Sequence, residues 1–373
     1  MTESRLKLVR LIPVLDFGGV ETVFEIQAGL IDASRYDLRI CTFWKDGAAA
    51  RVLREGGVPV DVLGIDPSIR NPRATVALAR YLRRVRPDIL QASISEASFH
   101  SALVAKACGV PLTIVEEHGL PDRPLPYRLI HAGLYRMVDG IVGVSKVSCS
   151  YVTDREFAPR DRVHLLYNAI APEFFSPLAP RRRSADRFTF LNVGRLHPMK
   201  NQERLIRAFA PVARARNDAR LVIVGAGELD TRLAALVAEL GLEGRVELPG
   251  YRQDVRSVVE VADCFVFPSL YESFGIAVVE AMARGVPAIV SSWGALPEVV
   301  GDLGERWIVD ALDIDGWSRA MTDMITLDAD AHAALGRRAR QIAERYTPER
   351  HSRELHALYD RLLAAKGISG PRD

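Results

Sequence analysis

Residues 263–290 read DCFVFPSLYESFGIAVVEAMARGVPAIV and contain a complete strand–helix–strand unit. The apolar run Cys264–Phe267 predicts a short buried strand that ends at a proline. A helix is expected at about Ile276–Arg284, because Gly285 follows it as a stop signal, and residues 288–290 begin the next strand. The loop before the helix therefore lies at the carboxyl edge of a parallel sheet, where open α/β folds bind ligands.

That loop carries groups suited to a phosphate. Ser273, Phe274 and Gly275 open the helix, so their backbone N–H groups and the helix dipole face an incoming anion. Glu272 precedes them, and Glu280 follows about 12 Å further along the helix axis. The two carboxylates can therefore hold opposite ends of one elongated ligand, with a diphosphate between them.

Each carboxylate also has an ordinary structural explanation. A Glu in the first turn of a helix commonly just complements the dipole, and a Glu further along is commonly solvated. Glu280, however, lies between Val279 and Ala281 in an apolar run, where a charge has little access to water and needs a partner. This context favours a ligand role for Glu280.

The segment Glu272-Ser273-Phe274-Gly275, together with Glu280, resembles the Glu-x7-Glu signature of retaining glycosyltransferases of family 4, residue by residue. That family has the GT-B fold, an α/β architecture in which two Rossmann-like domains with doubly wound parallel sheets face each other across a cleft. The resemblance implies that Glu272 lies near the donor sugar hydroxyls and that Glu280 binds the ribose hydroxyls of a nucleotide-sugar.

Size and composition agree with a soluble two-domain protein. The chain has 373 residues, of which 48% are hydrophobic and 26% charged, so it is long enough for two α/β cores. Its net charge of +2 argues against a general nucleic-acid binder. It shows neither a signal-peptide pattern nor an apolar run of transmembrane length. We expect a cytoplasmic protein, and peripheral contact with the inner membrane surface stays an open alternative.

The four cysteines are far apart and show no Cys-x-x-Cys spacing. Each falls in or beside an apolar run, so buried free thiols in a reducing compartment are expected rather than disulfides or metal ligands. The residues concerned are Cys41, Cys108, Cys149 and Cys264.

Strand-like runs alternate with helical patterns through the first half of the chain, which predicts a parallel, doubly wound sheet. The expected strands are 6–15, 38–43, 58–63, 88–91, 112–116, 140–144 and 163–166, and helical patterns include 73–85, 98–108 and 128–137.

A pair of glycines, Gly18 and Gly19, follows the first of these strands. Paired glycines let a backbone approach a ligand closely, although a tight structural turn is an equal alternative. The pattern is neither Gly-x-Gly-x-x-Gly nor a Walker loop, so dinucleotide and ATP sites gain no support. With Glu21 the pair resembles the Gly-Gly-x-Glu loop of the same transferases, which implies that it faces the donor phosphate.

His118 follows two acids, Glu116 and Glu117, at the end of a predicted strand and on the same sheet edge as the glycine pair. A lone His is ordinarily structural, but this position favours function. The family has a His-Gly at this point, and the resemblance implies that His118 contacts the donor sugar and helps to stabilise its transition state. Whether either acid touches a substrate stays open.

The stretch 171–187 is rich in proline and poorly patterned, and we interpret it as an interdomain linker. Its basic run, Arg181–Arg183, is suited to anionic lipid, although a solvated linker is the favoured alternative. The expected domains are 1–175, a Rossmann-like domain on the acceptor side, 176–350, a Rossmann-like domain that binds the nucleotide-sugar, and 351–373, a terminal helix that packs back on the first domain.

Two cations lie in the first strand-to-helix loop of the second domain. Arg195 and Lys200 are five residues apart and can converge on one anion, although two ordinary surface cations would look the same. The family has Gly-Arg-Leu followed by Lys at this spacing, which implies that both residues bind the donor diphosphate.

Two later strand ends complete the predicted donor site. Gly225 and Gly227 form a Gly-x-Gly without the third glycine of an NAD fingerprint, and the resemblance puts them beside the nucleotide. Tyr251 and Arg252 follow the next strand, and the resemblance implies that one of them covers the base.

Two Asp-x-Asp sequences, 313–315 and 328–330, look like metal-binding motifs of other transferases. Each begins a predicted helix, where Asp is an ordinary cap, so we expect no metal there. No cofactor is expected beyond the nucleotide-diphosphate sugar itself.

These features and the resemblance together predict an enzyme, a metal-independent glycosyltransferase of the hexosyltransferase type, and the resemblance implies that it retains the anomeric configuration. It would move a sugar to an acceptor hydroxyl on a carbohydrate or a lipid-linked molecule, in polysaccharide, glycolipid or glycoside biosynthesis. The fixed cations and the helix start would neutralise the leaving diphosphate. The alternatives are a nucleotide-sugar epimerase or a phosphorylase of the same fold, and a non-catalytic nucleotide-sugar sensor.

Overall fold

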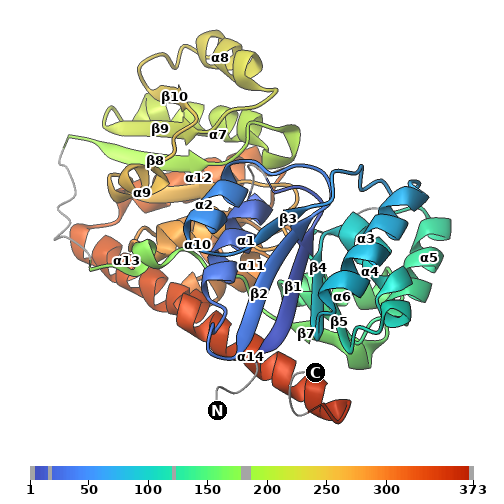
Figure 1. The fold of residues 1–373 in the computed structure, drawn as a ribbon. Helices are drawn as coiled ribbons and strands as arrows, with labels where there is room; N and C mark the ends of the chain where they lie inside the picture. The colour runs from blue at the N-terminus through green and yellow to red at the C-terminus, as the bar shows by residue number, and fades with distance from the viewer. Residues whose placement is uncertain (1–4, 16–18, 120–122, 178–185, 369–373) are drawn as a thin grey trace. The chain divides into compact units, whose positions relative to one another are not determined.

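The computed structural model describes residues 5–15, 19–119, 123–177 and 186–368, and for residues 19–22 only the backbone. The chain divides into two compact units. The first comprises Met1–Ala169 and Pro348–Asp373, and the second comprises Ile170–Thr347. Each unit contains one parallel sheet with helices between its strands, which confirms the predicted fold class (Figure 1).

The first unit contains a seven-stranded sheet in the order β3-β2-β1-β4-β5-β6-β7, and every neighbouring pair is parallel. Its strands are β1 (Leu6–Ile12), β2 (Tyr36–Thr42), β3 (Val60–Val62), β4 (Ile89–Ser93), β5 (Leu112–Glu117), β6 (Gly140–Gly143) and β7 (Val163–Leu165). Its helices are α1 (Gly19–Gly29), α2 (Ala48–Glu55), α3 (Pro72–Val85), α4 (Ser95–Val104), α5 (Leu125–Tyr135), α6 (Lys146–Asp154) and α14 (Pro348–Ala365), with short 3-10 turns η1 (Lys106–Cys108) and η2 (Arg160–Arg162).

The last helix of the chain, α14, covers one face of this sheet (Figure 1). Its residues Leu355, Leu358 and Tyr359 are buried and pack against Ile89 and Leu112 of the central strands. The opposite face is covered by α3, α4, α5 and α6, whose apolar residues form a second core. The first unit is therefore assembled from both ends of the chain.

The second unit contains a six-stranded parallel sheet in the order β10-β9-β8-β11-β12-β13. Its strands are β8 (Phe188–Val193), β9 (Ala219–Val224), β10 (Val246–Gly250), β11 (Cys264–Phe267), β12 (Ala288–Ser291) and β13 (Ile308–Val309). Its helices are α7 (Gln202–Ala215), α8 (Asp230–Glu239), α9 (Val255–Glu260), α10 (Ile276–Ala283), α11 (Leu296–Val300), α12 (Ile314–Thr326) and α13 (Ala329–Ala343). Five 3-10 turns are η3 (Pro172–Phe175), η4 (Pro198–Lys200), η5 (Gly301–Leu303), η6 (Glu305–Trp307) and η7 (Glu344–Tyr346).

The strand–helix–strand unit quoted at the outset is β11, α10 and β12, and its elements end within one residue of the predicted positions. The helix is short and deeply placed, because Val278, Val279, Ala281 and Met282 are all inaccessible to solvent. Such a helix is hydrophobic nearly all round, as expected for one that crosses the interior of a domain.

The first part of the predicted linker is packed onto the second unit. Phe174 is buried, and the Arg284 guanidinium donates to the Ser176 carbonyl at 2.9 Å. Arg340 donates to the Phe175 carbonyl at 2.9 Å. Two guanidinium groups thus satisfy carbonyls that a free linker would leave to water. The basic run Arg181–Arg183 lies outside the described residues.

Two other predictions were tested directly. Asp313 and Asp328 accept hydrogen bonds from the backbone N–H of Gly316 and Ala331, which confirms their prediction as helix caps. All four cysteines are free thiols, as predicted, but only Cys41 and Cys264 are buried. Cys108 and Cys149 are partly exposed, so the expectation of burial was wrong for these two. None of the described helices is both long and apolar enough to span a membrane.

Candidate functional site

The candidate donor-binding loops of the second unit follow β8, β9 and β11, at the carboxyl edge of the sheet. The sheet order places β8 between β9 and β11, so the chain reverses its direction of winding at this strand. In open α/β sheets the crevice at such a switch point is the usual ligand site. The loop after β8 carries Arg195 and Lys200, and the loop after β11 carries residues 269–275.

Lys200 and Glu272 form an ion pair across the switch point. The Lys200 Nζ lies 2.6 Å from Glu272 Oε2, and their side chains are 25% and 16% exposed. The same Nζ lies 5.1 Å from the centroid of the Phe267 ring, within range of a cation–π interaction. Both residues were predicted as ligand contacts, and the structure brings them together as partners.

Asn201 holds the two loops in place. Its Nδ2 donates to the carbonyls of Pro268, at 3.1 Å, and of Ala311, at 2.8 Å. The backbone N–H of Leu270 donates to the Met199 carbonyl at 2.9 Å. Asn201 has a φ of 59°, a left-handed conformation in which Asn is one of the few favoured residues. The sequence-based reasoning missed this residue, although an Asn between a strand-end loop and a helix is a recognisable signal.

Arg195 offers its guanidinium to solvent. The backbone beside it is fixed, because Gln202 Nε2 donates to the Arg195 carbonyl at 3.0 Å. The guanidinium makes no hydrogen bond or ion pair with the described part of the chain. A cation held on a fixed backbone and left without a protein anion is suited to an anionic ligand.

The start of α10 supplies backbone donors beside Glu272. Within the described residues, the N–H groups of Gly275, Ile276 and Ala277 have no acceptor. Gly275 has a φ of 98°, and a Cβ at this position would lie 2.7 Å from Leu296 Cδ2. Only glycine therefore fits the turn that directs these donors outward.

Phe274 contributes nothing to a ligand site through its side chain. It is 2% exposed, and its ring packs edge-to-face on Tyr346 with centroids 5.2 Å apart. Any contact of Phe274 with a ligand would come from its backbone. Ser273, by contrast, is partly exposed at the helix start.

Glu280 carries a carboxylate at a position where the charged form is disfavoured. It is partly buried, and no hydrogen bond or ion pair joins its carboxylate to another described residue. Loss of water raises the pKa of Glu280 to about 7, and the negative charge of Glu173 acts in the same direction. Glu280 is thus less solvated than an ordinary surface Glu, and its charged form is disfavoured in the free protein, which favours a ligand role over that of a solvated helix residue.

Gly225 and Gly227 have a packing role that the sequence did not reveal. A Cβ on Gly225 would lie 1.9 Å from the Gly194 carbonyl oxygen, and one on Gly227 would lie 2.2 Å from the Leu196 carbonyl oxygen. The backbone N–H of Leu196 donates to the Ala226 carbonyl at 3.0 Å. The two glycines thus let the loops after β8 and β9 touch, beside Arg195.

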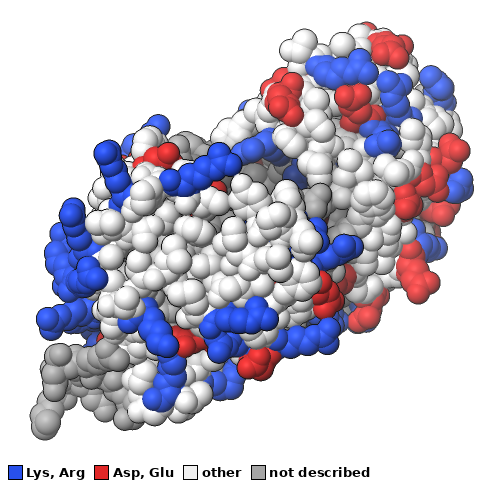
Figure 2. All heavy atoms as spheres, turned by 90° about the vertical axis from the view of Figure 1, so that its right-hand side faces the viewer, with Lys and Arg blue, Asp and Glu red and all other residues white. Residues whose placement is uncertain are grey.

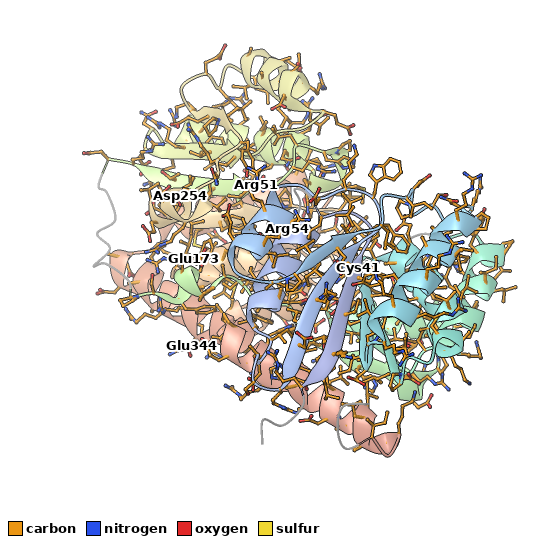
Figure 3. All side chains as sticks on the ribbon, viewed as in Figure 1. Cys41, Arg51, Arg54, Glu173, Asp254 and Glu344 are labelled. Atoms are coloured by element: carbon orange, nitrogen blue, oxygen red, sulfur yellow. The ribbon has the colours of Figure 1, made fainter. Side chains whose placement is uncertain are left out.

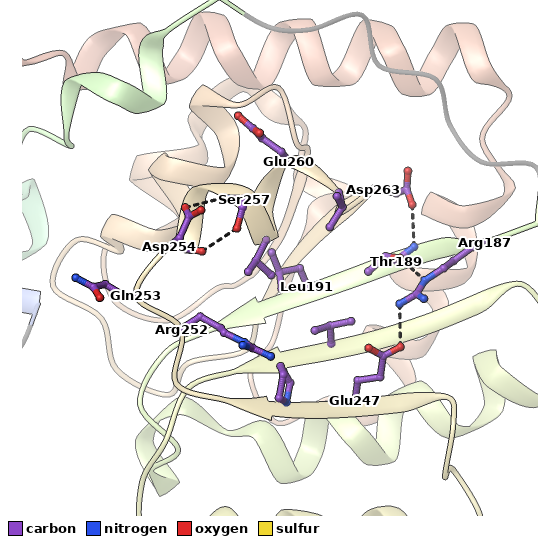
Figure 4. Close-up of a pocket in the computed structure, with 14 residues that line it drawn as sticks. Arg187, Thr189, Leu191, Glu247, Arg252, Gln253, Asp254, Ser257, Glu260 and Asp263 are labelled. Carbon is purple, nitrogen blue, oxygen red and sulfur yellow. Dashed lines mark hydrogen bonds and ion pairs between the residues drawn. The ribbon is translucent and has the colours of Figure 1, made fainter.

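Tyr251 and Arg252 follow β10, at the end of the sheet furthest from α10. Tyr251 is 66% exposed. Arg252 lines an open groove across β8, β9 and β10, together with Arg187 and Glu247, which form an ion pair at 2.9 Å (Figure 4). None of the other candidate residues lines this groove. The Arg252 side chain thus lies at a groove whose lining includes neither Lys200 nor Glu272.

In the first unit, Gly18 lies outside the described residues, and Gly19 is the first residue of α1. His118 follows β5, and its Nε2 lies 3.3 Å from Glu116 Oε2. Its side chain is only 6% exposed. His118 is thus held against a buried carboxylate, although its position at the strand end agrees with the prediction.

Glu116 is the counter-ion of a buried arginine. Arg10 Nη2 lies 3.1 Å from Glu116 Oε2, and both side chains are almost inaccessible to solvent. Ser93 and Gln91 of the neighbouring strand also donate to this carboxylate. Burial alone would raise the pKa of Glu116, but Arg10 and the hydrogen bond from His118 outweigh it and hold the pKa well below its usual range. Sequence reasoning missed Arg10, although a lone cation in an apolar strand requires a buried partner.

Glu117 is also buried and partnered. Tyr135 donates to it at 3.0 Å, and the Arg123 guanidinium lies 3.9 Å away and also pairs with Glu156 at 3.0 Å. Burial raises the pKa of Glu117 despite these partners. Both acids therefore have partners inside the first unit, and whether either touches a substrate stays a prediction to be tested. Figure 3 shows how densely side chains fill the described part of the chain.

Two protein-family models match the chain. The one described as "Glycosyl transferase 4-like domain" matches residues 18–169, and the one described as "Glycosyl transferases group 1" matches residues 179–342. The two matches fall on the two compact units.

Among individual relatives, a protein of Escherichia coli is 24% identical over 359 residues, which cover 86% of this chain and 88% of the relative. It is named UDP-Gal:alpha-D-GlcNAc-diphosphoundecaprenol alpha-1,3-galactosyltransferase. A D-inositol 3-phosphate glycosyltransferase of Mycolicibacterium smegmatis is 28% identical over 251 residues, which cover 63% of this chain and only 55% of that protein.

Among solved structures, the HepE protein of Anabaena, crystallised in complex with UDP, superposes with a TM-score of 0.83. The superposition covers 95% of this chain and 100% of HepE, at 19% identity. At this identity the likeness concerns the fold, and it agrees with two doubly wound parallel-sheet domains.

Proposed function

We propose that this chain, which belongs to the glycosyltransferases of the GT-B fold, transfers a sugar from a nucleotide-diphosphate sugar to an acceptor hydroxyl and retains the anomeric configuration. The observation that carries the proposal is the Lys200–Glu272 ion pair at the switch point of the sheet. It lies beside the first N–H groups of α10, which have no hydrogen-bond acceptor among the described residues. Cations and backbone donors that converge at such an edge suit a diphosphate.

In the proposed reaction the bond between the anomeric carbon and the donor diphosphate breaks, and a bond to the acceptor oxygen forms on the same face of the sugar. The acceptor proton passes to an oxygen of the leaving diphosphate. Negative charge grows on that diphosphate, and Lys200, Arg195 and the N–H groups at the start of α10 stabilise it. No step requires a metal ion, because these groups supply the positive charge.

The Lys200–Glu272 pair gives the two residues separate tasks once donor binds. Lys200 moves its hydrogen bond from Glu272 to the more highly charged diphosphate. Glu272 is then free to accept hydrogen bonds from the sugar hydroxyls. Glu280 accepts from the ribose hydroxyls, and Tyr251 lies against the base. The proposal also gives His118 a contact with the transferred sugar.

The relatives suggest which substrates to test first. The E. coli protein carries UDP-galactose and a lipid diphosphate acceptor in its name, and HepE was crystallised with UDP. We therefore propose UDP-hexoses as the first donors and a lipid-linked saccharide as the first acceptor, in polysaccharide or glycolipid biosynthesis. Because a lipid-linked acceptor lies in a membrane, the proposal also includes peripheral contact of the protein with a membrane.

Thermal-shift measurements against UDP-, GDP-, ADP- and dTDP-sugars provide the first test. We expect one nucleotide class to raise the melting temperature, and transfer assays with that donor then identify the acceptor. Nuclear magnetic resonance of the product reports the anomeric configuration, and addition of EDTA is expected to leave the rate unchanged.

The same assays separate the alternative functions. Isomerisation or phosphate-dependent cleavage of the donor without an acceptor would indicate an epimerase or a phosphorylase. Donor binding without turnover on any acceptor would indicate a sensor. Absence of stabilisation by every nucleotide-sugar would overturn the proposed site.

A further inference from the structure

The second unit exposes its large apolar side chains mainly at one edge of its sheet. Among the described residues of this unit, five of the six exposed large apolar side chains lie in loops that follow strands. They are Met199, Tyr251, Tyr271, Trp293 and Leu312. The surface at α8, at the top of Figure 2, instead carries Lys and Arg beside Asp and Glu. Apolar side chains that gather at a ligand-binding edge indicate contacts with a ligand.

The order of the strands also sets the order of these loops along the edge. That order is β10, β9, β8, β11, β12 and β13. The proposed function assigns Tyr251 after β10 to the base, Lys200 after β8 to the diphosphate and Glu272 after β11 to the sugar. The proposed donor thus runs along the edge toward β12. Neighbouring strands lie about 4.8 Å apart, so the next loop beyond the sugar is the one after β12, which carries Trp293.

The backbone around Trp293 is fixed to that of Glu272. The N–H of Ala295 donates to the Glu272 carbonyl at 2.9 Å, and a Cβ on Gly294 would lie 2.3 Å from the same oxygen. The N–H of Trp293 donates to Ser291 Oγ at 3.0 Å. The indole therefore starts from a backbone position one residue away from direct contact with Glu272.

The Trp293 indole is held at its polar end by Asp310. Its Nε1 donates to Asp310 Oδ2 at 3.3 Å, and Asp310 Oδ1 accepts from the Leu312 N–H at 2.8 Å. Asn201 donates to the Ala311 carbonyl at 2.8 Å, which ties this loop to the one that carries Lys200. Asp310 is exposed and forms no ion pair with a cation in the described part of the chain. Each of its oxygens can accept more than one hydrogen bond.

The indole of Trp293 is not used to fill the core. Trp307 and Trp317, in the same unit, are each 1% exposed, whereas Trp293 is 38% exposed although hydrogen bonds fix both its backbone and its ring. A ring that is fixed in place and open to solvent can bind a ligand without first losing side-chain freedom.

We propose that Trp293 and Asp310 determine donor specificity by binding the far side of the transferred sugar, and that they select a neutral hexose. The role of this pair rests on the proposed function, which assigns Glu272 to that sugar. The face of an indole carries partial negative charge and attracts the weakly positive C–H groups of a sugar ring. The Asp310 carboxylate accepts hydrogen bonds from sugar hydroxyls and repels a second carboxylate. The pair therefore favours a hexose over the corresponding hexuronic acid.

Isothermal titration with UDP and with UDP-glucose tests the role of Trp293. Trp293→Ala should bind UDP-glucose at least about tenfold more weakly than wild type and should bind UDP within about twofold of it, because only the sugar meets the indole. Trp293→Phe should restore most of the lost affinity, since it keeps an aromatic face. Trp293 is exposed, so both variants should keep the melting temperature of the free protein. Trp44→Ala is the matched control, because Trp44 of the first unit is 42% exposed, and it should bind both ligands as wild type does.

Titration with UDP-glucuronic acid tests the role of Asp310. Wild type should bind it at least about tenfold more weakly than UDP-glucose, and Asp310→Asn should reduce this difference several-fold, because the repulsion between two carboxylates is removed. Asp323→Asn, at an exposed acid on α12, should keep the wild-type ratio.

The outcomes separate this inference from the proposed function. Trp293→Ala that loses equal affinity for UDP and UDP-glucose, or loses none, would overturn the role of Trp293. Wild type that binds UDP-glucuronic acid as tightly as UDP-glucose, or an unchanged ratio in Asp310→Asn, would overturn the role of Asp310. Failure of wild type to bind both UDP and UDP-glucose would overturn the proposed UDP-hexose donor and this inference with it.

Discussion

At the level of single residues, the proposed donor site contains an ion pair, Lys200–Glu272, whose partners can be exchanged for those of a bound ligand. Lys200 and Glu272 are only partly buried, and ion pairs of this kind contribute little to folding, about 0–1 kcal/mol. Their geometry is nevertheless well defined, because Asn201 ties the two loops together. The pair therefore serves to orient both side chains for a ligand more than to stabilise the fold.

Replacing Lys200 by alanine should weaken donor binding by roughly 10–100-fold, because one hydrogen bond to a charged group is lost. The melting temperature of the free protein should change little. Isothermal titration with the preferred nucleotide-sugar measures the first effect. Arg207→Ala is the matched control, because Arg207 is a cation on α7 whose nearest anion, Glu239, lies at 4.0 Å. Equal donor affinity in the two variants would contradict the role of Lys200.

Glu280 predicts a dependence on pH. Its pKa is raised to about 7 in the folded protein, above that of an exposed Glu. Between about pH 4.5 and 7 the folded state therefore holds a proton that the unfolded state has lost, so stability falls as the pH rises through this window. The loss ends above pH 7, where both states are ionised.

The variant Glu280→Gln should therefore be more stable than wild type at pH 8, by about 1–3 kcal/mol, and should bind donor less tightly. At pH 4 the two proteins should have similar stability, because Glu280 is then protonated in both states. Denaturant unfolding at the two pH values measures this. A variant that is less stable than wild type at pH 8 would show that the carboxylate has a favourable partner.

His118 should act on turnover more than on donor affinity. It lies 3.3 Å from Glu116 and is oriented by that carboxylate. His118→Ala should reduce kcat by roughly 10²–10³-fold, since one stabilising group at the transition state is removed. The donor dissociation constant should stay within about threefold. Steady-state kinetics and titration of the same preparation separate the two effects, and a loss of affinity alone would refute the assignment.

At the level of elements, the site depends on strand-end loops that touch each other. Gly225 and Gly227 allow the loop after β9 to meet the loop after β8 through backbone contacts. The same principle holds at Gly294, where a Cβ would lie 2.3 Å from the Glu272 carbonyl oxygen. Backbone contacts between loops leave no space for side chains, and they fix the loops more firmly than side-chain contacts would.

Gly225→Ala and Gly227→Ala should each destabilise the second unit by roughly 2–4 kcal/mol, because the new methyl group meets a backbone oxygen that cannot move aside. Gly133→Ala is a matched control, since a Cβ on Gly133 has no atom within 4 Å. That control should be neutral or slightly stabilising, because Ala favours the helix. Thermal unfolding of the three variants makes the comparison, and equal stability would contradict the packing role.

At the level of the whole molecule, the chain crosses between its two compact units twice, near residues 169 and 347. The second crossing returns α14 to the first unit. There the Tyr359 hydroxyl donates to Gln91, which in turn donates to Glu116 beside His118. The end of the chain thus contributes to the buried polar network that supports His118.

Leu358→Ala should destabilise the first unit by about 2–5 kcal/mol, because Leu358 is 2% exposed in the core that α14 completes. Hydrogen exchange should accelerate in peptides of β1, β4 and β5. Peptides of the second unit should keep their protection. Arg353→Ala, an exposed position on the same helix, is the control. Faster exchange throughout both units would contradict the assignment of α14 to the first.

The amino-acid sequence alone determined the features that depend on neighbouring residues. The positions of the strands and helices were predicted from the apolar runs, from Gly285 and from the Asp caps. The predicted strand ends then identified the loops that carry Arg195, Lys200 and Glu272. These features are local, because a turn or a cap is decided within a few residues.

Only the tertiary structure decided which of these residues meet. Lys200 and Glu272 are 72 residues apart, and Arg10 and Glu116 are 106 apart. Lys200 and Glu272 follow β8 and β11, which are adjacent in one sheet. Arg10 and Glu116 lie on β1 and β5, which are separated by one strand in the other sheet. No local pattern encodes strand order. The partners of these charged side chains, their burial and the raised pKa of Glu280 therefore follow from the packing of the whole unit.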